Sequence, residues 1–195
     1  MSLIAAYCSA LLLLAAGSVL AGRFLPPKVR GWLLLLVVAA SILLPMPQQS
    51  LLRWLAGATG ELSVPSLVLL TGYILRRQTG KELLGKRVRL QLYLVVLVAG
   101  LVLYPATMGL SMVDPYRAGY GMSLNLLVSG LAVAYLLARQ YLLGLVFVLV
   151  VVAAETAAFR STNTWDYLVD PLLWFASPLL LLILLAPSSR ATQAS

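Results

Sequence analysis

Glu155 is the residue whose type and position point most directly to chemistry, because it lies inside the apolar stretch Val150–Phe159. If the predicted span begins at Tyr141, the carboxylate lies about 21 Å along it, at about 1.5 Å of rise per residue. The hydrocarbon core of a bilayer is about 30 Å thick, so Glu155 falls in the outer leaflet or at its edge. A carboxylate there is costly and needs a partner. The sequence leaves open a proton, cation or headgroup site, a structural Glu–Arg pair with Arg117 or Arg160, and a carboxylate that reaches the headgroups. The possible hydrogen-bond partners of Glu155 are Tyr104, Tyr120 and Asn125.

A polar and aromatic loop follows Glu155 and supplies further candidates, which are Arg160, Trp165, Asp166 and Tyr167. These side-chain types bind sugars, phosphates or amines. Part of the loop also has a structural interpretation. Asp170 before Pro171 is typical of a helix N-cap, and Asn163 three residues before Asp166 resembles a capping box.

The loop 111–122 repeats this pattern with Asp114 before Pro115, which again predicts a helix cap. Arg117 then lies in a loop rich in tyrosine and glycine. Two arginines with nearby carboxylates can clamp an anionic headgroup, or they can form a salt bridge between loops. The candidate binding residues are therefore Glu155, Arg117, Arg160, Asp166, Trp165, Tyr167 and Asp114, with no catalytic residue assigned and no metal or cofactor expected.

The composition sets the class of protein in which these residues must work. Of 195 residues, 62% are hydrophobic and 10% are charged, with one cysteine and no histidine. Such a chain is not a soluble globule, a disulfide scaffold, a zinc finger or an enzyme with a histidine-based triad. We expect an all-α, polytopic transmembrane helical bundle that forms a single integral membrane domain over residues 1–195. The net charge of +8 lies in short loops between apolar stretches, which indicates membrane topology and not nucleic-acid binding.

The apolar stretches predict seven spans, with six to eight allowed by the length of the chain. The predicted spans are 2–22, 31–47, 63–76, 88–109, 121–138, 141–158 and 171–187. The segment 47–62 is too polar to span and has the half-apolar pattern of a short helix in the headgroup plane.

The basic residues predict the orientation, with the N-terminus outside and the C-terminus in the cytoplasm of a bacterial inner membrane. Of the 14 basic residues, all but Arg53, Arg117 and Arg160 then lie inside, in agreement with the positive-inside rule. The carboxylates show the opposite bias, since only Glu82 lies inside. Acidic residues contribute little to topology, so insertion rules do not explain their asymmetry.

We expect from these features a small inner-membrane protein that is a non-catalytic subunit or accessory partner of a larger cell-envelope assembly. Its partners would be the bilayer and a larger membrane protein. One alternative is a transporter or lipid-handling protein that binds a lipid headgroup or glycolipid around Glu155, Arg117, Arg160 and Asp166. Another is an outer-leaflet transferase with Asp166 or Glu155 as the base. Whether the outer loops converge is not decided by the sequence.

Overall fold

The computed structural model describes residues 61–186 and, before them, residues 15–17, 26, 29, 31, 32 and 36. The described part of the chain is built from helices and loops without strands, which confirms the predicted all-α class. The spans predicted at 2–22 and 31–47 lie largely outside the described residues, and the interfacial segment 47–62 does so except for its last two residues.

Each predicted span after residue 60 corresponds to one long helix, and two short helices lie in the loops between them. In chain order the elements are α4 (Val64–Thr79), α5 (Lys86–Thr107), the 3-10 helix η1 (Pro115–Tyr120), α6 (Met122–Leu137), α7 (Tyr141–Glu155), α8 (Thr164–Leu168) and α9 (Pro171–Leu185). Helix α4 continues past the predicted end because Arg76 and Arg77 suit the negative end of a helix dipole. It stops at Gly80, whose φ of 72° is the left-handed conformation that favours glycine.

The lengths of these helices bear on the seven predicted membrane spans. Among the described residues, α5 is long and apolar enough to cross a membrane, with 22 residues and a mean hydropathy of 1.9. Helices α6, α7 and α9 are apolar but have only 15 or 16 residues. The chain leaves helical geometry earlier than predicted; Ala157, for example, has a φ of 48° just after the end of α7. The seven-span bundle is therefore confirmed only in its helical class.

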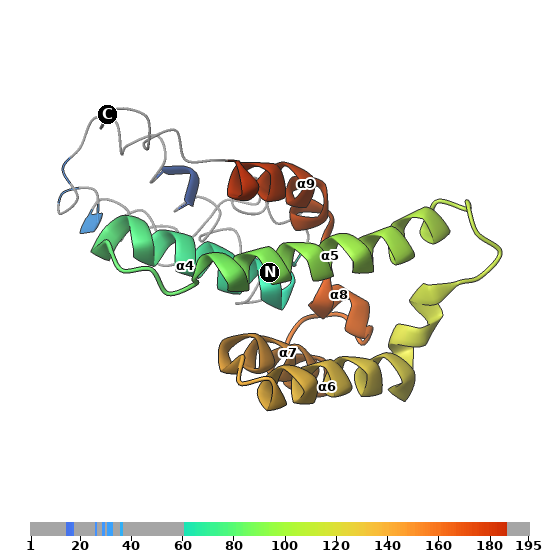
Figure 1. Cartoon of the computed structure of the whole chain (residues 1–195). Helices are drawn as coiled ribbons and strands as arrows, with labels where there is room; N and C mark the ends of the chain where they lie inside the picture. The colour runs from blue at the N-terminus through green and yellow to red at the C-terminus, as the bar shows by residue number, and fades with distance from the viewer. Residues whose placement is uncertain are drawn as a thin grey trace.

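Four of the five long helices in the described part of the chain pack as two pairs joined by the short elements, and α4 contacts α7 and α5 (Figure 1). Helices α6 and α7 form a hairpin, and α5 lies against α9. Glycines permit close approach within both pairs: a Cβ on Gly144 would lie 2.6 Å from Leu136, and a Cβ on Gly100 would lie 2.1 Å from the ring of Trp174. Helix α8 and η1 lie between the two pairs and contact each other.

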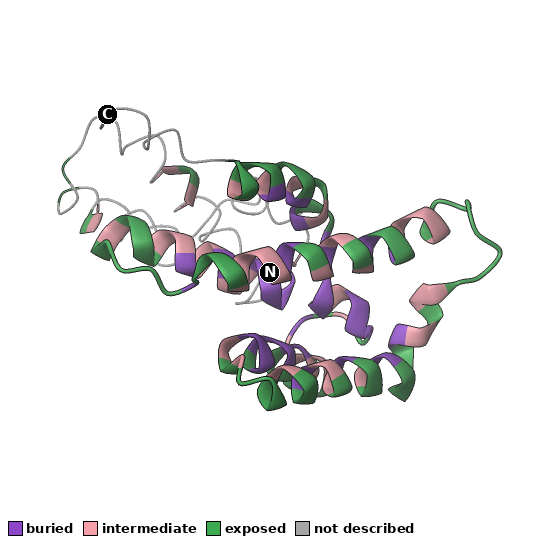
Figure 2. Ribbon diagram, viewed as in Figure 1, coloured by how far each residue is buried: buried purple, intermediate pink, exposed green. Residues whose placement is uncertain are grey.

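The core is a thin layer of apolar side chains, and apolar side chains also cover much of the outside. Leu92, Val96, Phe147 and Val150 are fully buried where the helices face one another. Figure 2 shows that the outward faces of the long helices are exposed. Their exposed side chains include Leu101 on α5, Leu127 on α6, Val152 on α7, and Phe175 and Leu182 on α9. Apolar surface of this extent marks an interaction with lipid or protein.

The close contact at Gly100 predicts that alanine substitutions at two helix glycines differ in their effect on stability. Gly100→Ala should destabilise the protein by about 1–3 kcal/mol, because the added methyl group overpacks against Trp174. Gly130 on α6 has open space around its Cβ position, so Gly130→Ala should be neutral or stabilising by up to about 1 kcal/mol. Thermal unfolding of both variants in detergent, followed by tryptophan fluorescence, measures the difference. Equal shifts for the two variants would contradict the packing of α5 on α9.

Candidate functional site

Three loops that are distant in sequence meet at one end of the structure. We call this region the loop cap and define it as residues 61–63, 114–121 and 156–170. The indole Nε1 of Trp165 donates a hydrogen bond of 2.8 Å to the carbonyl oxygen of Pro115, and the Asn163 amide donates one of 2.9 Å to that of Tyr116. Gly119 fits against Asn163 with no room for a Cβ. The loops that carry the predicted site residues therefore converge.

The helix caps predicted in these loops are present. Asp114 accepts a hydrogen bond from the backbone N–H of Tyr116, and Asp170 accepts one from Leu173, each at 3.0 Å. Asn163 caps α8 by accepting from Trp165. These side chains satisfy backbone donors that would otherwise be unpaired at helix starts.

Asp170 caps α9 as predicted and also binds residues at the start of α4. It is 2% exposed, and its second oxygen accepts hydrogen bonds from the backbone N–H of Ser63 at 3.1 Å and from the Ser63 hydroxyl at 2.6 Å. The Ser66 hydroxyl donates to the same oxygen. Ser63 is itself the N-cap of α4. One buried carboxylate thus joins the N-termini of α4 and α9.

Asp166, Trp165 and Tyr167 are held inside the loop cap. The Tyr116 hydroxyl donates to Asp166 at 3.1 Å. Burial, with the Asp166 carboxylate nearby, raises the pKa of Tyr116 well above its ordinary value, so this phenol stays a neutral donor. Trp165 and Tyr167 are buried, and burial also raises the pKa of Tyr167. The Tyr167 hydroxyl donates to the Ser161 carbonyl oxygen at 2.7 Å, so it holds the loop together from inside.

Glu155 is the last residue of α7 and is exposed. Its carboxylate accepts a hydrogen bond of 2.5 Å from Asn125, one of its predicted partners. The Asn125 carbonyl oxygen accepts from the Thr164 hydroxyl at 2.6 Å. The chain of contacts links α7, α6 and α8.

The two arginines of the predicted site are exposed and are not joined to its carboxylates. Arg117 makes no ion pair within residues 61–186. Arg160 contributes its backbone N–H, which donates to Glu61 at 2.8 Å. The Glu155–Arg pair, one of the alternatives that the sequence left open, is therefore absent from the described part of the chain, where Glu155 is hydrogen-bonded to Asn125.

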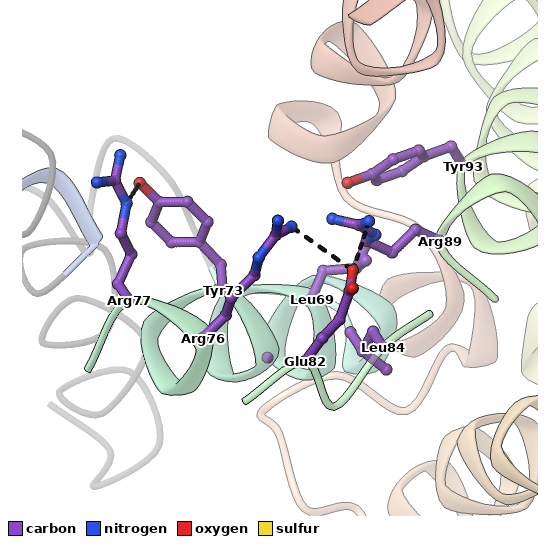
Figure 3. Close-up of a pocket in the computed structure, with 9 residues that line it drawn as sticks. Leu69, Tyr73, Arg76, Arg77, Glu82, Leu84, Arg89 and Tyr93 are labelled. Carbon is purple, nitrogen blue, oxygen red and sulfur yellow. Dashed lines mark hydrogen bonds and ion pairs between the residues drawn. The ribbon is translucent and has the colours of Figure 1, made fainter. Parts of the chain in front are cut away.

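A cavity of about 490 Å³ lies at the other end of α4 (Figure 3). Its charged side chains come from α4, from the loop after it and from the start of α5. The lining residues are Leu69, Gly72, Tyr73, Arg76, Arg77, Glu82, Leu84, Arg89 and Tyr93. We call Arg76, Arg77, Glu82 and Arg89 the basic mouth.

An apolar groove of about 250 Å³ adjoins this cavity and shares Leu69, Tyr73 and Tyr93 with it. The groove lies between α4 and α9. Its other lining residues are Leu62, Ser66, Leu70, Leu172, Leu173, Ala176 and Leu180. Ser66, one of the lining residues, is also a donor to Asp170.

The basic mouth is organised around Glu82. Its Oε1 lies 2.7 Å from a terminal nitrogen of Arg89 and 3.5 Å from one of Arg76. Figure 3 shows the two guanidinium groups meeting the carboxylate from different helices. Arg77 is held beside the cavity by a 3.1 Å hydrogen bond from its Nε to the Tyr73 hydroxyl. The Nε of Arg89 is buried and has no acceptor in the described part of the chain.

Leu84 fixes the loop that carries Glu82. It is 4% exposed and packs against Gly72, where a Cβ would lie 2.6 Å from the Leu84 side chain. The charge of the basic run 76–89 is enough to fix membrane orientation and also predicts attraction to anionic lipid headgroups, but no motif in the sequence marked a discrete binding site here. The signal that could have marked it was Glu82, the single carboxylate predicted on the inner side.

Neither cavity is lined by any of the seven residues proposed from sequence. Within the described residues, no group of three or more His, Cys, Asp or Glu side chains is placed to hold a metal ion. Comparison of the chain with protein-family models, with curated proteins and with solved structures finds no match.

The Asp170 contacts predict that the two aspartate caps differ in their effect on stability. Asp170→Ala removes the acceptor of four donors and should cost roughly 3 kcal/mol or more, because buried donors are left unpaired. Asp114→Ala removes an exposed cap and should cost about 1 kcal/mol. The unfolding midpoints of the two variants in detergent test this. A loss for Asp170→Ala no larger than that for Asp114→Ala would contradict the joining role of the carboxylate.

Proposed function

We propose that the chain is a multi-pass protein of a bacterial inner membrane, with one domain, seven spans, an outer N-terminus and a cytoplasmic C-terminus. The exposed apolar faces of α5, α6, α7 and α9 support this proposal, since lipid would cover them. The distribution of basic residues supports the orientation. In this orientation the basic mouth lies at the cytoplasmic side and the loop cap at the outer side.

We further propose that the protein binds a lipid-like amphiphile with a phosphate headgroup. The observation that carries this proposal is that the cavity with the basic mouth adjoins the apolar groove, with which it shares the lining residues Leu69, Tyr73 and Tyr93. The proposal keeps the lipid-handling alternative drawn from the sequence, but it moves the site from the loop cap to the other end of α4.

The two parts of the site suit the two parts of such a ligand. Guanidinium groups bind phosphate oxygens through paired, charge-assisted hydrogen bonds, and Arg76 and Arg89 present two of them at one point. The groove beside them is lined mainly by leucine side chains and tyrosine rings, which favour burial of an acyl or prenyl chain. Anionic lipids of the cytoplasmic leaflet would meet the basic mouth at the membrane surface. We assign binding to this site and no reaction.

A second candidate is the accessory role in a larger membrane assembly. It is favoured by the loop that leads into the loop cap, where Leu110, Met112 and Val113 are at least 72% exposed beside the exposed Arg117. Methionine and arginine side chains are enriched at protein interfaces. The geometry gives less support to a transferase, because Asp166 and Glu155 each accept a hydrogen bond from a neighbouring side chain.

The lipid-binding proposal predicts the effect of removing two positive charges from the basic mouth. The double variant Arg76→Gln/Arg89→Gln should retain about tenfold less dioleoyl phosphatidic acid than the unchanged protein, through the loss of charge-assisted hydrogen bonds. The measurement is native mass spectrometry of protein released from nanodiscs that contain phosphatidic acid and phosphatidylcholine.

The matched control is Arg117→Gln/Arg160→Gln, which removes the same charge from exposed positions of the loop cap. This control should retain phosphatidic acid normally. A similar loss in both double variants would show that net charge and not the basic mouth controls retention. No loss in the Arg76→Gln/Arg89→Gln protein would overturn the proposal.

A further inference from the structure

We infer that Glu82 is an internal competing anion that restricts the basic mouth to phosphate monoester headgroups and excludes diesters. This inference rests on the proposed function, because it concerns the selectivity of the same site. It assigns to Glu82 a role that neither membrane topology nor helix capping supplies.

Glu82 stands where the phosphate of a ligand would bind. Its Oε1 is shared by Arg76 and Arg89, at 3.5 and 2.7 Å, in the bridging position that a phosphate oxygen takes between two guanidinium groups. Both arginines line the cavity, and Figure 3 shows Glu82 between them. A ligand that binds both guanidinium groups must therefore displace this carboxylate.

The loop around Glu82 is anchored, while the carboxylate itself is free to leave. Leu84 is buried against Gly72, and Gly80 ends α4 in a left-handed turn, so the backbone on both sides has a fixed place. The Glu82 side chain is 42% exposed. An ion pair at this exposure contributes little net stability, because water solvates the separated groups well. Displacement needs only a rotation of the side chain into water.

Charge and acceptor number decide which headgroup displaces Glu82. A phosphate monoester carries about −1.5 to −2 charges near pH 7 and has three acceptor oxygens. A phosphate diester carries one negative charge, as the carboxylate does, and gains little by replacing it. A built-in competitor that a weaker ligand cannot displace is a recognised route to specificity.

The test compares phosphatidic acid, a monoester, with phosphatidylglycerol, a diester with the same acyl chains. Nanodiscs contain equal amounts of the two lipids in phosphatidylcholine, and native mass spectrometry measures the ratio retained by the protein. The unchanged protein should favour phosphatidic acid by about tenfold, which corresponds to one additional charge-assisted contact. Glu82→Gln should retain more phosphatidylglycerol and reduce the preference to about twofold.

Three further experiments test the ligand chemistry. Asp114→Asn removes one exposed negative charge from the loop cap and should leave the preference unchanged. Lowering the pH from about 8 to about 5 should weaken the preference of the unchanged protein, because the second pKa of a phosphate monoester is about 6. Ala176→Trp narrows the apolar groove and should reduce the retention of phosphatidic acid. Inorganic phosphate should still compete with the phosphatidic acid that remains bound to this variant, as it does in the unchanged protein. This combination separates a site for the headgroup from a site that requires the lipid chain.

The outcomes separate this inference from the proposed function. If the unchanged protein retains both lipids equally and the Arg76→Gln/Arg89→Gln protein loses both, the site binds lipid and the role of Glu82 is wrong. If Glu82→Gln keeps the tenfold preference while its unfolding midpoint is unchanged, the inference also falls. If the double arginine variant loses neither lipid, both proposals fail. A Glu82→Asp variant, which keeps the charge but shortens its reach, should lie between the unchanged protein and Glu82→Gln.

Discussion

The structure depends on one buried carboxylate that serves two helix N-termini. The first N–H groups of a helix have no acceptor within it, and the positive ends of two helix dipoles repel each other when they meet. The Asp170 carboxylate pairs with these donors and places a negative charge between the two dipole ends. It accepts hydrogen bonds from Leu173 at the start of α9 and from Ser63 and Ser66 at the start of α4. The four donors also make the burial of the charge tolerable, because each replaces a hydrogen bond to water.

This contact determines what lies between the two helices. Because α4 and α9 are joined at their N-termini, the space between them becomes a groove that is lined by Ser66 near this joint and by Tyr73 farther along α4. The other end of α4 has a separate attachment, where Leu84 packs into the notch at Gly72. The two attachments fix α4 along its length, and the helix contributes residues both to the groove and, with Arg76, to the adjoining cavity.

Local patterns in the sequence predicted local structure well, but they did not predict contacts between distant segments. The aspartate–proline pairs predicted caps because a cap involves only a few consecutive residues, and Asp114 and Asp170 both act as predicted. The additional role of Asp170 requires Ser63, which is 107 residues away and carries no distinguishing pattern. For the same reason the candidate residues of the loop cap were recognised as a polar group, whereas the inward positions of Trp165 and Tyr167 were not. The basic mouth was missed because one explanation, membrane topology, already accounted for its arginines.

Membrane insertion explains the positive charge between α4 and α5 but not the carboxylate within it. Six basic residues in 14 positions repel one another, and Glu82 relieves part of that repulsion by contacting Arg76 and Arg89 from two different helices. The same contact fills the place of an anionic ligand. The Glu82 carboxylate therefore stabilises the α4–α5 connection and at the same time lowers the affinity of the basic mouth for an anion. A ligand that displaces it must bridge the two helices in its place. A headgroup with a single negative charge would gain little over the carboxylate, and Glu82 would keep its place between Arg76 and Arg89.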